Sequence, residues 1–164
     1  MFEVNISQDI DTVNYRSLAQ QLSGLLSGER DFIANSAQFS AFIYQALPVL
    51  NWAGFYLYDG KELVLGPFQG KVACVRIPLG RGVCGSAALR QETILVTDVH
   101  AFDGHIACDS ASNSEIVLPI LKDNRLIGVF DIDSPQLARF SERDQAGLEG
   151  LLSIYKESTD FPVM

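Results

Sequence analysis

The stretch from Trp52 to Leu65 constrains the fold more than any other part of the chain. It reads WAGFYLYDGKELVL, two extended apolar runs separated by Asp59-Gly60, a dipeptide typical of tight hairpin turns. Alternation along the first run predicts one face for the core and an opposite face that carries Trp52, Gly54, Tyr56 and Tyr58. The second face is either an aromatic wall with a gap at the glycine or a second packed face beneath helices.

Helical periodicity flanks this region on both sides. Apolar residues at helical spacing predict helices over Tyr15–Leu26 and Asp31–Leu47, and Gly28 and Pro48 follow them as stop signals. Another helix is predicted from Ser141 to about Lys156, because Ser141 and Asp144 resemble a capping box. These helices are interpreted as scaffold.

The middle of the chain is predicted to form about six strands and one short helix. The expected strands are Trp52–Tyr58, Leu63–Leu65, Val72–Ile77, Thr93–Val96, Ile116–Leu121 and Arg125–Ser134, and the expected helix is Ser86–Arg90. Because most links are hairpin-like, we expect an α+β fold with a largely antiparallel sheet and helices on one face. The opposite face is then available for a pocket. We predict a single domain over residues 1–164, with N-terminal helices at about 15–47, the sheet and active site at about 51–134, and a C-terminal helix at about 141–156.

Composition excludes several classes of function. The 164 residues are 48% hydrophobic, and 20 acidic against 12 basic residues give a formal charge of −8. No basic patch suited to phosphates is visible, so we expect no nucleic-acid partner. No apolar run is long enough for a signal peptide or a membrane span, so we predict a cytoplasmic protein with mostly reduced cysteines.

The three cysteines indicate thiol chemistry. Cys108 lies on a polar, small-residue loop that leads into a strand at Glu115, Cys84 lies in a glycine-rich turn expected to expose it, and Cys74 lies on a predicted strand. One thiolate can attack an electrophile, and a second cysteine can condense with the resulting sulfenic acid. Three alternatives remain open: buried inert thiols, a zinc site, and a Cys–His hydrolase with His100 or His105 as the base.

Two aspartates form a second unusual feature. Alternation along RLIGVFDIDS places Asp131 and Asp133 on one face with Ile127 and Val129. Burying like charges together is costly unless they meet a cation, protons or hydrogen-bond donors. The alternative is that the strand emerges into solvent at this end.

Three segments together resemble one known family. They are WAGFYLYDGKELVLGPFQGKVACVRIPLGRGVCGSA, DVHAFDGHIACDSASNSEIVLPI and IGVFDIDS, and they occur in the same order within about Asn51–Phe140. This combination is similar to free methionine-(R)-sulfoxide reductase, a GAF-domain family. The resemblance implies a six-stranded antiparallel sheet flanked by helices, a homodimer, free methionine sulfoxide as substrate and thioredoxin as electron donor. Because the cysteine and histidine spacing lacks a zinc knuckle, we expect no metal, and we expect no cofactor.

The resemblance also implies roles for eight residues. Cys108 matches the family's catalytic cysteine, and Cys84 and Cys74 match its other two redox cysteines, with their division of labour left open. The residues that match the substrate site are Trp52, Tyr56, Glu115, Asp131 and Asp133. A crowded, partly desolvated carboxyl group can hold the proton that makes a sulfoxide oxygen a better leaving group. The alternative from another class is a non-catalytic GAF module that senses a small molecule such as a cyclic nucleotide.

Overall fold

The computed structural model describes residues 2–5, 8–104 and 111–163. Within these ranges it contains four α-helices, six strands and two 3-10 turns. In chain order they are η1 (Ile10–Thr12), α1 (Tyr15–Leu25), α2 (Phe32–Ala46), β1 (Trp52–Tyr58), β2 (Glu62–Gly70), β3 (Arg76–Pro78), α3 (Gly82–Arg90), β4 (Ile94–Val96), η2 (Val99–Ala101), β5 (Ser114–Lys122), β6 (Arg125–Ser134) and α4 (Glu142–Ser158). Among the described residues, no helix is both long enough and apolar enough to cross a membrane.

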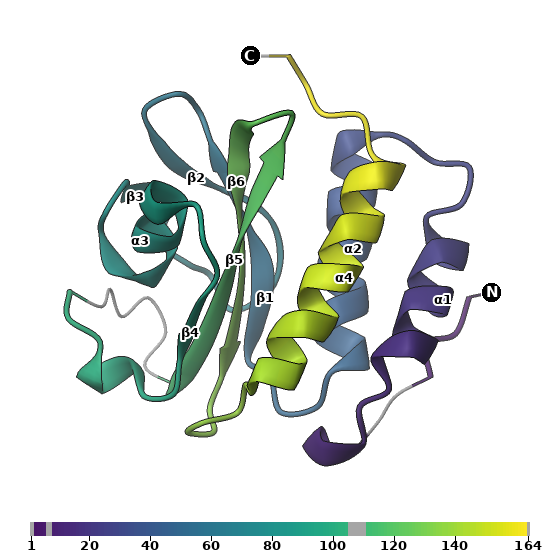
Figure 1. The fold of residues 1–164 in the computed structure, drawn as a ribbon, viewed down its shortest axis with the longest axis horizontal. Helices are drawn as coiled ribbons and strands as arrows, with labels where there is room; N and C mark the ends of the chain where they lie inside the picture. The colour runs from purple at the N-terminus through teal and green to yellow at the C-terminus, as the bar shows by residue number, and fades with distance from the viewer. Residues whose placement is uncertain (1, 6–7, 105–110, 164) are drawn as a thin grey trace.

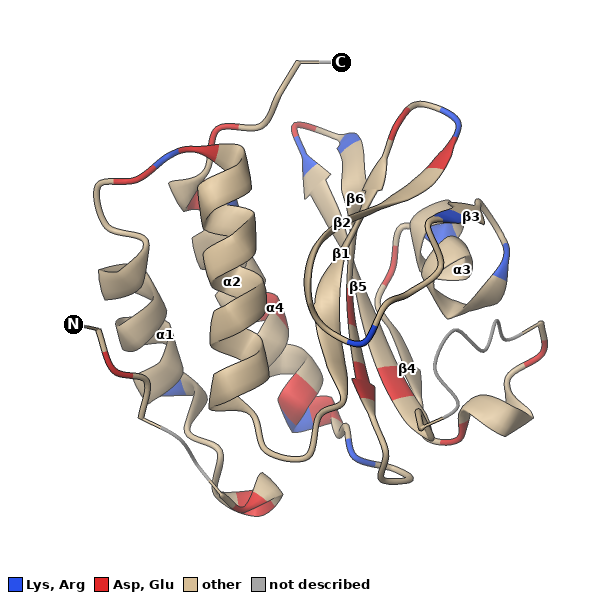
Figure 2. Ribbon diagram, turned by 180° about the vertical axis from the view of Figure 1, so that it is seen from behind, with Lys and Arg blue, Asp and Glu red and all other residues tan. Residues whose placement is uncertain are grey.

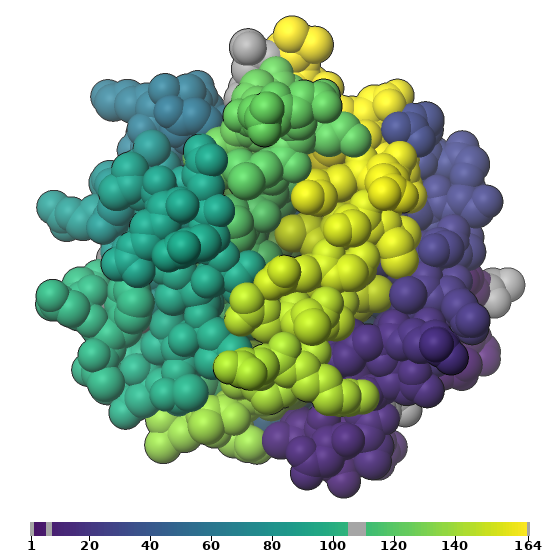
Figure 3. Space-filling model, in the orientation of Figure 1, coloured from purple at the N-terminus to yellow at the C-terminus, as the bar shows by residue number. Residues whose placement is uncertain are grey.

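The strands form one antiparallel sheet in the order β3-β2-β1-β6-β5-β4. Helices α1, α2 and α4 form a layer on one side, and α3 lies on the other (Figure 1). In the space-filling view, the surface of α4 lies between that of the strands and that of α1 and α2 (Figure 3). The expected α+β architecture, a six-stranded antiparallel sheet flanked by helices, is confirmed.

The helix-covered face of the sheet holds the larger core. Phe55 on β1 and Phe130 on β6 have ring centroids 4.8 Å apart, and Phe39 of α2 lies 4.8 Å from Phe130. Tyr155 of α4 closes the cluster at 5.1 Å from Phe39. Full burial of each ring contributes about 1.5–3 kcal/mol. The predicted core face of β1 is therefore confirmed, since Ala53 and Phe55 are both fully buried there.

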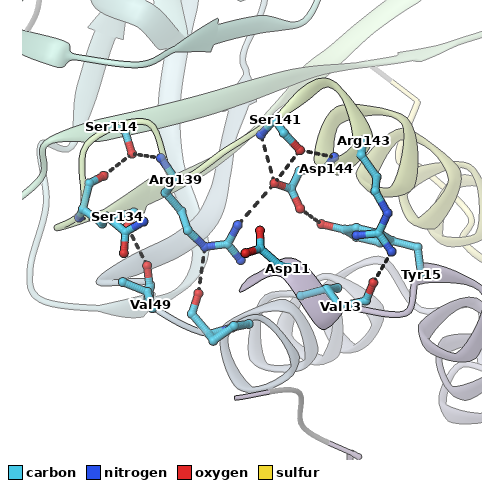
Figure 4. Close-up of polar contacts among 12 residues, drawn as sticks. Asp11, Val13, Tyr15, Val49, Ser114, Ser134, Arg139, Ser141, Arg143 and Asp144 are labelled. Carbon is cyan, nitrogen blue, oxygen red and sulfur yellow. Dashed lines mark hydrogen bonds and ion pairs between the residues drawn. The ribbon is translucent and has the colours of Figure 1, made fainter. Parts of the chain in front are cut away.

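A buried polar cluster closes the end of this layer (Figure 4). The guanidinium of Arg139 lies 3.3 Å from Asp144 Oδ2, and its Nε donates to the Pro48 carbonyl at 2.9 Å. The Tyr15 hydroxyl donates to Asp144 Oδ1 at 2.5 Å, and the Ser141 amide donates to Oδ2 at 2.9 Å. The predicted capping box of α4 is present. The charge of the Asp144 carboxylate is therefore balanced by Arg139, and these contacts join α1, α4 and the segment that enters β1.

Two predictions near the cysteines were wrong. The strand expected over Val72–Ile77 begins only at Arg76, because Trp52 Nε1 and the Tyr56 hydroxyl donate to carbonyls of the preceding segment. The helix expected from Ser86 begins at Gly82 and carries Cys84 in its first turn, where the thiol is buried rather than exposed.

The predicted faces of β6 were wrong at its start. Ile127 packs in the helix-side core and Leu126 in the opposite cluster, the reverse of simple alternation. Ile120 pairs with Gly128 and Leu121 with Leu126, so one extra residue on β6 interrupts the ladder. Such a bulge changes the side to which the following side chains point.

Candidate active site

A pocket lies on the sheet face opposite α1, α2 and α4, beneath the N-terminal end of α3. Its lining includes six of the eight residues predicted for the site: Trp52, Tyr56, Cys84, Glu115, Asp131 and Asp133. Cys108 and His105 lie outside the described residues. Cys74 does not line the pocket, although its neighbours Val72 and Ala73 do.

Strand register brings the three carboxylates together. Glu115 on β5 pairs with Asp133 on β6, and Asp133 pairs in turn with Trp52 on β1. Residues that pair directly across antiparallel strands have Cβ atoms about 4.5–5.5 Å apart. Asp131 lies two residues along β6 from Asp133 and therefore on the same face. Three acidic side chains thus share one small area of the sheet.

Asp131 is buried at the centre of these groups. It is 5% exposed, so burial raises the pKa of its carboxyl group well above the usual range. The charges of Asp133 and Glu115 raise that pKa further, as do hydrogen bonds with both side chains. Its Oδ1 atom is buried and has no hydrogen-bond partner among the described residues. The alternative that the strand emerges into solvent is wrong at Asp131, and the group is suited to hold a proton near neutral pH.

The aromatic wall is built from three rings rather than two. Trp52 stacks on Tyr56 with centroids 5.8 Å apart and on Phe68 of β2 with centroids 5.2 Å apart. Phe68 pairs with Gly54, and a Cβ at that glycine would lie 2.2 Å from the Phe68 Cβ. The predicted gap at Gly54 is therefore filled by Phe68. Sequence reasoning missed this residue because a register shift in β2 decides which side chain meets the glycine.

The two described cysteines, Cys84 and Cys74, differ in oxidation state. Cys84 is a buried free thiol whose pKa is raised by burial, by the charges of Asp131, Glu115 and Asp133, and by a hydrogen bond with Asp131. Cys74 is half-buried and disulfide-bonded. A thiol with a raised pKa is a poor nucleophile at neutral pH, since the thiolate is the reactive form.

Cys84, Glu115 and Asp131 also offer ligand atoms that lie within 4.8 Å of one another, a geometry that could hold a metal ion. Thiolate and carboxylate donors suit zinc among the common metals. The expectation that the site uses no metal therefore stays a prediction. His100 does not line the pocket, and its Nε2 lies 3.1 Å from Asn113 Oδ1.

The structure adds a cation that sequence reasoning did not single out. Arg81 lines the pocket just before α3 and is the only basic residue in the described lining. The first turn of α3 contributes Gly82 and Val83 to the same wall. A helix N-terminus and a guanidinium both favour anions. The sequence signal that could have identified Arg81 is its position immediately before Gly82, the first residue of α3.

Comparison with known proteins places the fold in a family. The GAF domain family model matches residues 35–155. The chain is 55% identical over 139 residues to the free methionine-R-sulfoxide reductase of Escherichia coli (strain K12), covering 85% of this chain and 84% of that protein. It is 43% identical to the enzyme of the same name from Saccharomyces cerevisiae (strain ATCC 204508 / S288c), covering 92% and 94%.

A solved structure agrees with these matches. The free methionine-R-sulfoxide reductase of Neisseria meningitidis, solved in complex with its substrate, superimposes with a TM-score of 0.90 at 44% identity, covering 96% of this chain and 95% of that one. The fold, the family model and the curated relatives agree over most of the chain. The protein therefore belongs to the GAF-domain family of free methionine-R-sulfoxide reductases.

Proposed function

We propose that this chain reduces free methionine-(R)-sulfoxide to methionine. The observation that carries the proposal is the buried carboxyl group of Asp131, with its raised pKa, beside an aromatic wall in the same pocket. The family to which the chain belongs supports the substrate, since relatives at 55% and 43% identity bear that activity in their names.

The pocket offers a contact for each part of a free amino-acid sulfoxide. The rings of Trp52 and Tyr56 enclose the S-methyl group, and burying one methyl-sized group contributes about 1 kcal/mol. The carboxylates around Asp133 bind the ammonium group, and Arg81 with the N-terminal end of α3 binds the substrate carboxylate. A methionine within a peptide lacks both charges, which explains a preference for the free amino acid.

The reaction proceeds in two steps. Cys108 attacks the sulfoxide sulfur while Asp131 protonates the oxygen, so that methionine leaves and Cys108 carries the oxygen as a sulfenic acid. A second cysteine then attacks the sulfenic sulfur, forms a disulfide and releases water. Reduction of that disulfide by a dithiol protein such as thioredoxin returns both thiols and completes the cycle.

The state of the described cysteines favours Cys74 over Cys84 as the resolving residue. Cys74 is disulfide-bonded, whereas Cys84 is buried, protonated and hydrogen-bonded to Asp131. We assign Cys84 to the positioning of Asp131 rather than to electron transfer. The cytoplasmic location and the homodimer belong to this proposal as expectations of the same family.

Loss of NADPH tests the proposal when thioredoxin, its reductase and free methionine sulfoxide are supplied with the protein. We expect turnover of the R diastereomer and none in Cys108→Ser. The alternative, a sensing GAF module, predicts tight binding of a small molecule without turnover and indifference to that substitution. Absence of turnover with every reductant, dithiothreitol included, would reject the reductase.

A further inference from the structure

The basic residues of this acidic chain are concentrated in one region. Residues 61–90 carry one acidic residue, Glu62, against five basic residues, which are Lys61, Lys71, Arg76, Arg81 and Arg90. Figure 2 shows blue segments along the β2–β3 connection and around α3, on the side of the sheet opposite α1, α2 and α4. Arg76 is ion-paired to Asp59 and Glu62 at 3.4 and 3.1 Å. Among the described residues, no ion pair engages Lys71.

Two exposed valines lie within this basic region. Val72 is 88% exposed and Val75 is 61% exposed, and together they flank Cys74 in the chain. Exposing two valines within four residues is unfavourable in water, because neither gains from burial. Exposed apolar residues rimmed by charge mark interaction sites. We call the surface formed by Lys71, Val72 and Val75 the Cys74 face; Val72 also lines the edge of the pocket.

The backbone of the Cys74 face is anchored to the sheet by hydrogen bonds. Residues 71–75 belong to neither β2 nor β3, and Cys74 is half-buried and disulfide-bonded. The Trp52 ring nitrogen donates to the Lys71 carbonyl at 3.1 Å, and the Tyr56 hydroxyl donates to the Cys74 carbonyl at 2.8 Å. Trp52 and Tyr56 therefore fix the segment that carries Cys74, while their rings line the pocket.

We propose that the Cys74 face docks an acidic dithiol protein of the thioredoxin type, which reduces the disulfide at Cys74. This inference rests on the proposed function and assigns the surface where its reductant binds. The valines meet the apolar surroundings of the partner's nucleophilic cysteine, and Lys71 meets an acidic rim. A small dithiol such as dithiothreitol needs neither contact.

The exchange balances over two steps. The partner's thiolate attacks Cys74 Sγ, the existing disulfide breaks, and its other sulfur leaves as a thiolate. The partner's second thiol then attacks the mixed disulfide, so Cys74 leaves reduced and the partner leaves as a disulfide. Two electrons pass from the partner to the chain, and the half-buried Cys74 is not among the residues that line the pocket.

Reduction of the oxidised, substrate-free protein tests the docking surface directly. The rate of thiol appearance is measured with reduced thioredoxin and, separately, with dithiothreitol, for Val75→Asp, Lys71→Glu and the wild type. We expect the rate constant with thioredoxin to fall roughly tenfold in each variant, since each change removes an apolar or charge contact at a small interface. The rate with dithiothreitol should stay within about twofold, and salt should slow the wild type more than Lys71→Glu.

Matched controls come from the opposite layer. Ile33 on α2 is 61% exposed, like Val75, and Arg16 is an exposed cation on α1. Ile33→Asp and Arg16→Glu should leave both rate constants unchanged. Equal thioredoxin rates for wild type, Val75→Asp and Lys71→Glu would overturn the inference, as would reduction of the wild type by thioredoxin no faster than by dithiothreitol at equal thiol concentration. These rates involve no sulfoxide, so failure of the proposed function would appear only in the turnover assay.

Discussion

Asp144 and Asp131 are buried to nearly the same extent, at 4% and 5% exposure, yet their surroundings are opposite. Asp144 meets the Arg139 guanidinium, the Tyr15 hydroxyl and the amide of Ser141. Asp131 meets two further carboxylates and a thiol, and one of its oxygens has no partner among the described residues. A buried carboxylate with a cation and donors holds a fold together, whereas one among like charges stores a proton.

Replacing Asp131 with Asn should produce the largest effect on activity. The amide keeps the shape of the side chain but cannot deliver the proton, and loss of a general acid lowers turnover roughly 10²–10⁴-fold. The free energy of unfolding at neutral pH should hold or rise, because the amide is neutral without taking up a proton and cannot add to the charge of the neighbouring carboxylates. Steady-state turnover of free methionine sulfoxide and urea denaturation measure the two quantities. A variant that turns over like the wild type would remove Asp131 from the chemistry.

Replacing Arg139 with Met should produce the largest effect on stability. The substitution leaves Asp144 buried without its cation, and breaking a buried pair in this way costs about 3–5 kcal/mol. Urea denaturation measures the loss. The turnover of the protein that remains folded should match the wild type, since the cluster lies on the helix side of the sheet. The exposed pair of Arg30 and Asp160, which are 2.8 Å apart, supplies the control, and Arg30→Met should cost under about 1 kcal/mol.

The dependence of stability on pH should also separate the two aspartates. The pKa of Asp131 is raised above its unfolded value of ~3.9, so the folded chain binds more protons than the unfolded chain between the two pKa values. Stability contributed by this group is therefore present at low pH and is lost as pH rises through the folded pKa, by up to about 1.4 kcal/mol per unit. Thermal unfolding across pH should show this slope in the wild type and a flatter one in Asp131→Asn. Identical slopes would contradict the assignment of a stored proton.

Replacing Cys84 with Ser should lower turnover much less than replacing Asp131 with Asn. A hydroxyl can keep the hydrogen bond to Asp131, so turnover should fall by less than about tenfold. Cys74→Ser is the matched comparison, and it should abolish thioredoxin-linked turnover. The amount of methionine formed in a single turnover without reductant, measured for Cys84→Ser and Cys74→Ser, separates an effect on sulfoxide reduction from an effect on recycling by thioredoxin. If Cys84→Ser lost thioredoxin-linked turnover and Cys74→Ser kept it, their proposed roles would be reversed.

Much of the scaffold was predictable because its signals are local. The helices α1 and α2, the Ser141 cap and the hairpin after Tyr58 follow from apolar spacing, side-chain capping and turn chemistry, each decided within a few residues. The position of Asp131 and Asp133 on the same face follows in the same way from the two-residue period of a strand. These properties hold wherever the segment is placed in the fold.

The environment of each site residue was decided over longer distances. Phe68 fills the space above Gly54 through a register shift in β2, and a bulge in β6 exchanges the sides of Leu126 and Ile127. Cys84 is buried because α3 begins at Gly82, where glycine tolerates φ of 62°. A one-residue shift in register moves a side chain to the other face, and a local pattern carries no signal for it.

The sequence by itself determined which chemical groups are available and which faces they share: an aromatic strand, a pair of aspartates and three thiols in a chain with an antiparallel pattern. Only the tertiary structure decided that Asp131 is buried among like charges while Asp144 is paired, and that burial beside an acid raises the pKa of Cys84. The reason is physical, because a pKa depends on every charge, dipole and solvent molecule excluded around the group, and most of these come from distant parts of the chain.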